Sequence, residues 1–347
     1  MLKVGLIGLE FAGKKSLFSL LTGKEESQHS LTKEEVAAVN VPDERIEKLE
    51  KFYNSRKKVY SQLEFHLIPS IKKESKETQK ALTEAKEVDM FGIVIRAFKD
   101  ENVFHPYNSI DSKRDYEIIK NELIFADLFL VETRLERLEK QLRTKKEDYL
   151  LKEKEILLRF KEELENNNYL NKVELREDEA KIVRGFQFLT LKPIFIIINC
   201  DDSDIHKKFD VDSDISTINI STKIEAEILQ LEENERKEFL EDLNLEDTSL
   251  NRLIKFTYDY GNLISYFTAG EKEIHSWQIK KGTTAVKAAG VIHSDFEKGF
   301  IRAEVISYDD LMRAGSEAEA KKQGLYRLEG KEYIVQDGDI IIFRFNL

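Results

Sequence analysis

Apolar runs alternate with helix-spaced segments along most of the first 265 residues. Nearly unbroken apolar runs are typical of strands that a parallel sheet buries on both faces. They occur at Leu2–Ile7, Gly92–Phe98 and Ile194–Asn199. Shorter strands are predicted at 62–68 and 216–220, and helices after Lys14, after Pro42, at 71–88, at 178–190 and after Lys223 to about 265. Strands that alternate with helices predict a doubly wound α/β domain whose ligand lies at the carboxyl ends of the strands.

A different pattern begins near residue 113. Apolar residues then recur at alternating spacings of three and four, at Leu128, Val131, Leu135, Leu138 and Leu142, and again at Leu150, Leu157, Phe160 and Leu164. This seam predicts two antiparallel helices that form a coiled-coil arm. The charged residues 145–148 separate the two halves of the seam, and no glycine or proline marks the position of the turn. The alternative is that both helices pack onto the main domain, because short seams also occur in ordinary bundles.

The last part of the chain, from about residue 267, is richer in glycine. Nine of the fifteen glycines lie beyond residue 260. Strand-like runs occur at 277–279, 301–306, 332–335 and 340–345. Short strands punctuated by glycine predict a small α+β domain.

The composition excludes several classes of protein. The net charge is −11, which argues against binding DNA with the whole surface but leaves room for a local basic patch that contacts RNA. No apolar run approaches the roughly 18–20 residues of a membrane span, and the start lacks the features of a signal peptide. A single cysteine and scattered histidines predict a cytoplasmic protein without a zinc site.

The first strand is followed by a partial P-loop. Gly8, Gly13 and Lys14 fit the pattern Gly-x4-Gly-Lys-[Ser/Thr], in which backbone N–H groups and the lysine hold phosphates. We therefore predict that residues 10–16 bind phosphate, namely Glu10, Phe11, Ala12, Gly13, Lys14, Lys15 and Ser16. The alternative is a glycine-bearing turn between strand and helix, as in any doubly wound sheet.

The two groups that hold Mg²⁺ in P-loop proteins are missing. Lys15 stands where the metal-binding hydroxyl belongs, and Ser16 comes one residue late. The second strand reads Glu64-Phe65-His66-Leu67-Ile68-Pro69-Ser70, with neither the aspartate that supports the metal nor the glycine that senses the γ-phosphate. We therefore predict no metal site and regard Mg²⁺ as a doubtful cofactor.

Two other strand ends carry residues suited to a nucleotide base. Asn199-Cys200-Asp201-Asp202 occupies the place of Asn-Lys-x-Asp, and the carboxylate of Asp202 has the two acceptor oxygens that guanine requires. Ser221-Thr222-Lys223 follows the next strand. We predict that Asn199, Cys200, Asp202, Ser221, Thr222 and Lys223 bind the base, with adenine still open. Alternatively, Asn199 only caps its strand.

The chain resembles the YchF, or Obg-like ATPase, family throughout its length. The matching segments are GLxxxGK at 8–14, NELxxADL at 121–128, FLTLKP at 188–193, a glutamate-rich stretch at 229–245, LNRLI at 250–254, YFTAG at 266–270, HSDFEKGFIRAEVISYDDL at 293–311 and GKEYIVQDGDIIIFRFN at 330–346. The resemblance implies a Ras-like P-loop domain over 1–112 and 178–265, a coiled-coil insertion over 113–177, and a β-grasp domain of the TGS type over 266–347. It also implies binding of ATP or GTP and association with ribosomes.

The chain departs from the family around the γ-phosphate. The family has Ser-Thr after Gly-Lys, Asp-x-Ala-Gly after the second strand and a glycine-rich switch beyond it, whereas this chain has Lys15-Ser16, Leu67–Ser70 and the glycine-free segment 71–80. The Phe-Pro-Phe-Cys-Thr stretch of the first switch is also missing. One hypothesis is that the Lys15 ammonium replaces the metal as a fixed cation; the other is a surface lysine without phosphate contact.

Three functions follow from these departures. The first is a nucleotide-binding, ribosome-associated protein with weak or absent hydrolysis, which the retained Gly8, Gly13, Lys14 and Asn199 favour. The second is an active GTPase or ATPase with a relocated Mg²⁺ site. The third is a scaffold for RNA or protein that binds no nucleotide.

In the last domain, Trp277 with Lys280, Lys281 and Lys287 suggests contact with RNA. The alternative is that these are solvated lysines beside a core tryptophan.

Overall fold

The computed structural model describes residues 1–24, 35–73, 75–144 and 147–346. Contacts divide the chain into two compact units: residues 2–37 with 64–250, and residue 1 with 38–63 and 251–347. We call them the P-loop unit and the C-terminal unit. Among the described residues, no helix combines the length and the apolar character needed to cross a membrane.

The P-loop unit is built on a six-stranded sheet in the order β2-β4-β1-β5-β6-β7. Its strands are β1 (Leu2–Gly8), β2 (Glu35–Asn40), β4 (Gln62–Leu67), β5 (Met90–Arg96), β6 (Ile194–Asn199) and β7 (Thr217–Ile220); residues 38–40 of β2 and 62–63 of β4 are counted with the other unit. The strands β1, β5, β6 and β7 are paired in parallel, and every residue of β5 and β6 is buried. The predicted doubly wound α/β domain is therefore confirmed.

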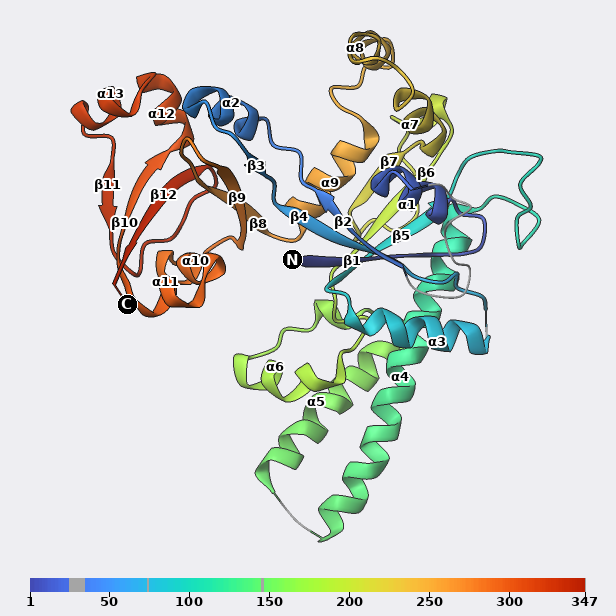
Figure 1. Cartoon of the computed structure of the whole chain (residues 1–347). Coiled ribbons are helices and arrows are strands. Elements are labelled where there is room, and N and C mark those ends of the chain that lie inside the picture. Colours follow the sequence, from blue (N-terminus) through green and yellow to red (C-terminus); the bar gives the residue numbers. More distant parts are fainter. Residues whose placement is uncertain (25–34, 74, 145–146, 347) are drawn as a thin grey trace. The chain divides into compact units, whose positions relative to one another are not determined.

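Helices cover both faces of this sheet. The helices of this unit are α1 (Lys14–Thr22), α3 (Lys76–Glu84), α4 (Ser112–Thr144), α5 (Asp148–Glu165), α6 (Glu177–Val183), α7 (Thr222–Ile228) and α8 (Glu233–Asp242), and only some of them lie against the sheet. Figure 1 shows α1 and α7 on one side of the sheet, and α3 and α4 on the other; α1 contacts α7, and α3 contacts α4. Since β1 lies at the centre of the sheet, the loop that follows it opens at the carboxyl edge, where ligands bind in such folds.

The helices α4 and α5 form the predicted antiparallel arm (Figure 1). Val131, Leu135 and Leu138 of α4 are buried, as are Leu157, Phe160 and Leu164 of α5. The buried Glu153 accepts two hydrogen bonds from the Arg134 guanidinium, at 2.6 and 2.8 Å, which fixes the register of the two helices. The sequence left the position of the turn between the two helices open, and residues 145 and 146 lie outside the described residues.

The C-terminal unit contains a second sheet in the order β11-β10-β12-β8-β9-β3. Its strands are β3 (Lys58–Val59), β8 (Leu263–Thr268), β9 (Ile274–Lys280), β10 (Phe300–Ser307), β11 (Arg327–Glu329) and β12 (Asp339–Phe345). The antiparallel pair β8–β9, the helix α10 (Ala285–Ile292) and the parallel pairing of β12 with β8 produce the predicted β-grasp arrangement. Tyr266, Ala289 and Phe343 share one core between α10 and the sheet.

Other helices of this unit are α2 (Glu44–Tyr53), α11 (Ser294–Lys298), α12 (Tyr308–Ala314) and α13 (Glu317–Lys322), and α9 (Ser249–Tyr260) belongs to it from residue 251 onward. Asp43 caps α2, the helix predicted after Pro42, by accepting a hydrogen bond from the Arg45 N–H. Residues 38–63 belong to this unit because β3 pairs with β9 and the Arg45 guanidinium binds Asp337 at 2.7 Å. The division of the chain at residues 112, 177 and 265 stays a prediction.

Several element boundaries differ from the predicted ones. The helix expected at 178–190 ends at Val183, and a 3-10 turn follows, closed by Gln187 at a φ of 52°. The helices expected up to 265 end with α9 (Ser249–Tyr260), and residues 332–335 form only an isolated bridge at Ile334. The edge strand β2 went unpredicted, since its apolar run is only four residues long, Val36–Val39, and three of its six residues are exposed.

Candidate functional site

The loop between β1 and α1 has the backbone of a phosphate-binding loop. Gly13 has a φ of 89°, and a Cβ there would lie 2.1 Å from the Nδ2 of Asn199. Glycine is therefore required at this position both for its backbone conformation and for the close approach of Asn199. The first turn of α1 then presents Lys14, Lys15 and Ser16. This strand, loop and helix N-terminus is the arrangement in which backbone N–H groups meet an anion.

Lys14 is buried within the loop that precedes it. Its ammonium donates hydrogen bonds to the Gly8 carbonyl at 2.6 Å, to the Leu9 carbonyl at 3.5 Å and to the Ser70 hydroxyl at 2.9 Å. Burial lowers the pKa of Lys14 to about 7, and the nearby Glu10 carboxylate opposes that shift. A buried ammonium held mainly by neutral oxygens leaves the loop ready for an anionic partner.

All seven predicted phosphate-binding residues line one cavity of about 720 Å³. Its other walls come from the segment after β4, from α3 and from the loop after β5. The further lining residues are Leu9, Pro69, Ser70, Lys72, Glu77, Lys80, Ala81, Glu84, Phe98 and Val103. The Lys72 ammonium lies 3.2 Å from the Glu10 carboxylate across the cavity rim. Sequence reasoning missed these walls, because only the fold brings residues 69–84 and 98–103 to the loop.

The loop after β5 is shaped by a buried arginine that the sequence did not single out. The Arg96 guanidinium donates to the carbonyls of Phe98, Asp100, Val103 and Phe104, at 3.0 to 3.3 Å. These hydrogen bonds fold residues 98–104 into a compact turn and hold Phe98 and Val103 in the cavity wall. The signal in the sequence was an arginine within an otherwise apolar strand.

The predicted base-binding residues form a second cluster next to the loop. Asn199 is buried; its Nδ2 donates to the Ala12 carbonyl, and its Oδ1 accepts from the Thr222 N–H, each at 3.2 Å. Asn199 therefore connects the end of β6 to the loop after β1 and to the start of α7, instead of only capping its strand. The Ser221 hydroxyl donates to an oxygen of Asp202 at 2.9 Å and so orients that carboxylate.

Cys200 and Lys223 occupy different environments within this cluster. Cys200 is buried, with its thiol 3.4 Å from the Ile220 carbonyl, and burial raises its pKa to about 12. Lys223 is exposed in the first turn of α7. The neighbouring Asp201 accepts from the Lys99 N–H at 3.2 Å, which ties the loop after β6 to the loop after β5.

The conventional Mg²⁺ positions carry no oxygen donor. Lys15 follows Lys14 in α1, and Leu67 ends β4 with only 3 % of its surface exposed. Within the described ranges, no group of three His, Cys, Asp or Glu side chains is arranged to hold a metal ion. These residues do not fit a metal held in the usual P-loop manner.

In the C-terminal unit, Trp277 and two of the three lysines near it, Lys280 and Lys287, have partners within the protein. The Trp277 ring stacks on His275 at 3.6 Å between centroids, and its N–H donates to Thr268. The Lys280 ammonium donates to the Gly261 carbonyl, and Lys287 pairs with Glu297. Contact of these residues with RNA stays a prediction, and their packing favours a structural role.

Comparisons with known proteins agree on one family. The family model described as YchF-GTPase_C, "Protein of unknown function (DUF933)", matches residues 263–346. The "Ribosome-binding ATPase YchF" of Bacillus subtilis is 39 % identical over 365 residues, covering 100 % of both chains. The protein of the same name from Haemophilus ducreyi is 38 % identical over 99 % of both. The solved Schizosaccharomyces pombe YchF GTPase superimposes with a TM-score of 0.84 at 29 % identity, covering 99 % of this chain and 97 % of that one.

Proposed function

The chain belongs to the YchF family, and on that basis we propose that it binds a purine nucleoside triphosphate at the P-loop, hydrolyses it weakly or not at all, and associates with the ribosome. The relatives' names give ATPase, GTPase and ribosome binding. The observation that carries the proposal is that Gly13, Lys14 and the other five predicted residues line one cavity, with Lys14 at its base.

Phosphate binding in this proposal rests on the loop and its lysines. The backbone N–H groups of residues 10–16 surround the β-phosphate, and Lys14 leaves Ser70 to contact the β- and γ-phosphates. Lys15 supplies a fixed positive charge next to the γ-phosphate, where a hydroxyl would otherwise hold the metal. Phosphoryl transfer depends on charge neutralisation between the β- and γ-phosphates, so a chain without the metal-holding oxygens hydrolyses poorly.

Base recognition in this proposal rests on Asp202. One of its oxygens is occupied by Ser221, and the carboxylate accepts from the N1–H and N2–H of guanine. Adenine offers no such pair of donors, so we propose a preference for GTP over ATP.

The base preference is tested by replacing Asp202 with asparagine. We expect the Kd for GTP to rise at least tenfold, because one acceptor becomes a donor facing guanine, whereas the Kd for ATP changes less than threefold; a charged hydrogen bond contributes about 1.5–3 kcal/mol. Titration calorimetry measures both, with Asp204→Asn as the control in the same 3-10 turn. Equal effects on both nucleotides would contradict the assignment.

Nucleotide binding should also take up a proton above neutral pH. The pKa of Lys14 is about 7 in the free protein, and bound phosphate raises it because the anion favours the ammonium form. Affinity therefore falls as pH rises from about 7.5 to about 9.5, by up to about tenfold per pH unit. Calorimetry in two buffers of different ionisation enthalpy measures the uptake, and an affinity that stays level over this range would disprove it.

Ribosome association is the part of the proposal that rests on the relatives alone. Co-sedimentation of the purified protein with ribosomes, with GTP, with ATP and without nucleotide, tests it directly. Pelleting with ribosomes in at least one of these states supports the proposal, and failure to pellet in all three contradicts it.

A further inference from the structure

A short segment, Phe188–Pro193, follows the 3-10 turn after α6, leads into β6 and carries a half-buried lysine. We propose that this lysine, Lys192, is a positioning residue for the nucleotide cavity: its ammonium holds the end of α3, and α3 forms one wall of that cavity. The effect on nucleotide affinity rests on the proposed function, whereas the effect on α3 does not. Lys192 is not among the described residues that line the cavity.

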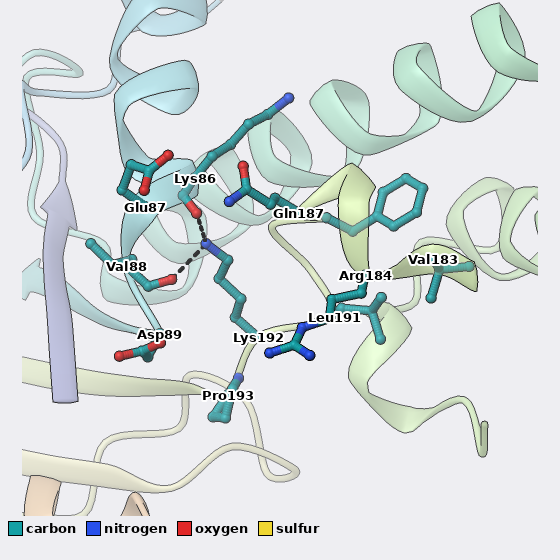
Figure 2. A pocket seen from close by; sticks show the side chains of 11 residues that line it. Lys86, Glu87, Val88, Asp89, Val183, Arg184, Gln187, Leu191, Lys192 and Pro193 are labelled. Carbon is teal, nitrogen blue, oxygen red and sulfur yellow. Dashed lines mark hydrogen bonds between the residues drawn. The ribbon is translucent and has the colours of Figure 1, made fainter. Parts of the chain in front are cut away.

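The contacts of Lys192 converge on one backbone turn. Its ammonium donates to the carbonyls of Ala85, Lys86 and Val88, at 3.3, 2.5 and 2.6 Å. Figure 2 shows the side chain reaching from Lys192 toward the last two of these carbonyls. Residues 85–87 form a 3-10 turn that continues α3, so these oxygens include carbonyls that a helix end leaves without intrahelical partners. A lysine that binds them stabilises the helix end.

The helix α3 itself lines the nucleotide cavity. Glu77, Lys80, Ala81 and Glu84 all line it. The helix has only nine residues, and so short a helix depends on its caps and tertiary contacts for stability. Ser75 caps its start by accepting from the Thr78 N–H, and Lys192 holds its end. The position of this cavity wall therefore depends on Lys192.

The same segment is fixed to the helical arm by the buried carboxylate of Asp127. The Asp127 carboxylate of α4 accepts from the Leu189 N–H at 3.0 Å, and from the Thr190 N–H and hydroxyl at 2.7 Å each. Residues 188–193 are thus bound to α4 on one side and to the end of α3 on the other. The contacts form a continuous path from the cavity wall through α3, Lys192 and Asp127 to the arm.

The surroundings of Lys192 explain why its replacement should weaken the hold on the end of α3. A cavity of about 390 Å³ adjoins it, lined in part by Val88, Arg184 and Leu191 (Figure 2). The aliphatic part of Lys192 crosses this hollow, and the ammonium lies 5.6 Å from the centre of the Phe91 ring. An apolar replacement retains the packing but leaves three carbonyls without their donor.

The first test uses the full chain without nucleotide. We expect Lys192→Met to speed hydrogen exchange of the α3 amides at least tenfold, whereas Lys192→Arg, which keeps a charged donor, stays within threefold of the unaltered protein. Lys181→Met, at an exposed lysine of α6, is the matched control and changes nothing. Unchanged exchange in α3 of the folded Lys192→Met variant would overturn the proposal, and this readout holds whether or not nucleotide binds.

The second test asks whether the position of α3 affects binding of the γ-phosphate. Lys192→Met should raise the Kd for the triphosphate about tenfold and that for the diphosphate less than twofold. The reason is that Ser70 and α3 follow β4, where P-loop proteins have the glycine that senses the γ-phosphate. An equal loss for both would contradict a positioning role.

In the double variant Asp127→Asn, Lys192→Met, the change in Kd for the triphosphate should deviate by at least threefold from the product of the two single changes. Strict additivity of the two effects would refute the path to the arm. If the unaltered protein binds no nucleotide, the proposed function fails and the exchange experiment alone decides the role of Lys192.

Discussion

Replacing Lys14 by alanine is expected to weaken binding of the nucleoside triphosphate at least 100-fold. Lys14 is buried at the base of the cavity, where its ammonium already binds the Gly8 carbonyl and the Ser70 hydroxyl. Hydrogen bonds that involve a charged group contribute about 1.5–3 kcal/mol each, and two such bonds to phosphate account for a change of this size. The effect is large because Lys14 is buried, and hydrogen bonds of a charged group are stronger in a low-dielectric site than in water.

Titration calorimetry of Lys14→Ala with GTP and with ATP measures this loss. Lys237→Ala, at an exposed lysine outside the cavity, is the control and should bind as the unaltered protein does. Circular dichroism checks that the variant is folded, because removal of a buried group also changes packing. Folded Lys14→Ala that binds nucleotide with unaltered affinity would show that the loop is not the phosphate site.

Replacing Lys15 by serine should make nucleotide binding depend on magnesium. Serine restores the hydroxyl that P-loop proteins use to hold Mg²⁺, and it removes the positive charge that we assign to the γ-phosphate. Without magnesium, we expect the Kd of the variant to be about tenfold higher than that of the unaltered protein, a difference of about 1.4 kcal/mol. Added magnesium should recover at least part of that loss in the variant and have no effect on the unaltered protein.

The control for this variant is Lys24→Ser, which makes the same exchange at an exposed lysine just beyond α1. Titrations with and without magnesium, in a buffer containing a chelator for the metal-free series, separate the two effects. If Lys15→Ser binds metal-free nucleotide as tightly as the unaltered protein, Lys15 is a surface lysine without phosphate contact.

The buried parts of the fold were predictable from the sequence because burial dictates their residues. The IFIIIN run of β6 and the seam of Val131, Leu135 and Leu138 have patterns that only a buried strand and a helical interface produce. The strand β2 has no such pattern, because an edge strand with exposed side chains can be made of many residues. The placement of residues 38–63 in the C-terminal unit depends on pairings such as that of β3 with β9, which no local pattern encodes.

The candidate site, like the fold, has residues that the sequence predicted and residues that only the structure revealed. Gly13 and Lys14 follow from local backbone chemistry, so the motif alone was enough to single out the loop that we propose to bind phosphate. Ser70 was noticed only as a missing glycine, and its hydrogen bond to Lys14 required the fold. Lys192 gave no signal of its role, because its partners are backbone carbonyls more than 100 residues away in the chain. Long-range contacts with backbone atoms leave no trace in one sequence.

The most direct test of metal-independent nucleotide binding is calorimetric titration of the unaltered protein with GTP and with ATP, each with and without magnesium. The account predicts that GTP binds more tightly than ATP, and that magnesium changes neither Kd by more than about threefold, since Lys15 and Leu67 stand where oxygen donors would hold the metal. Binding that requires magnesium would contradict the account and place an active metal site in this protein. Absence of binding by both nucleotides would contradict it as well and move the function to the arm and the C-terminal unit.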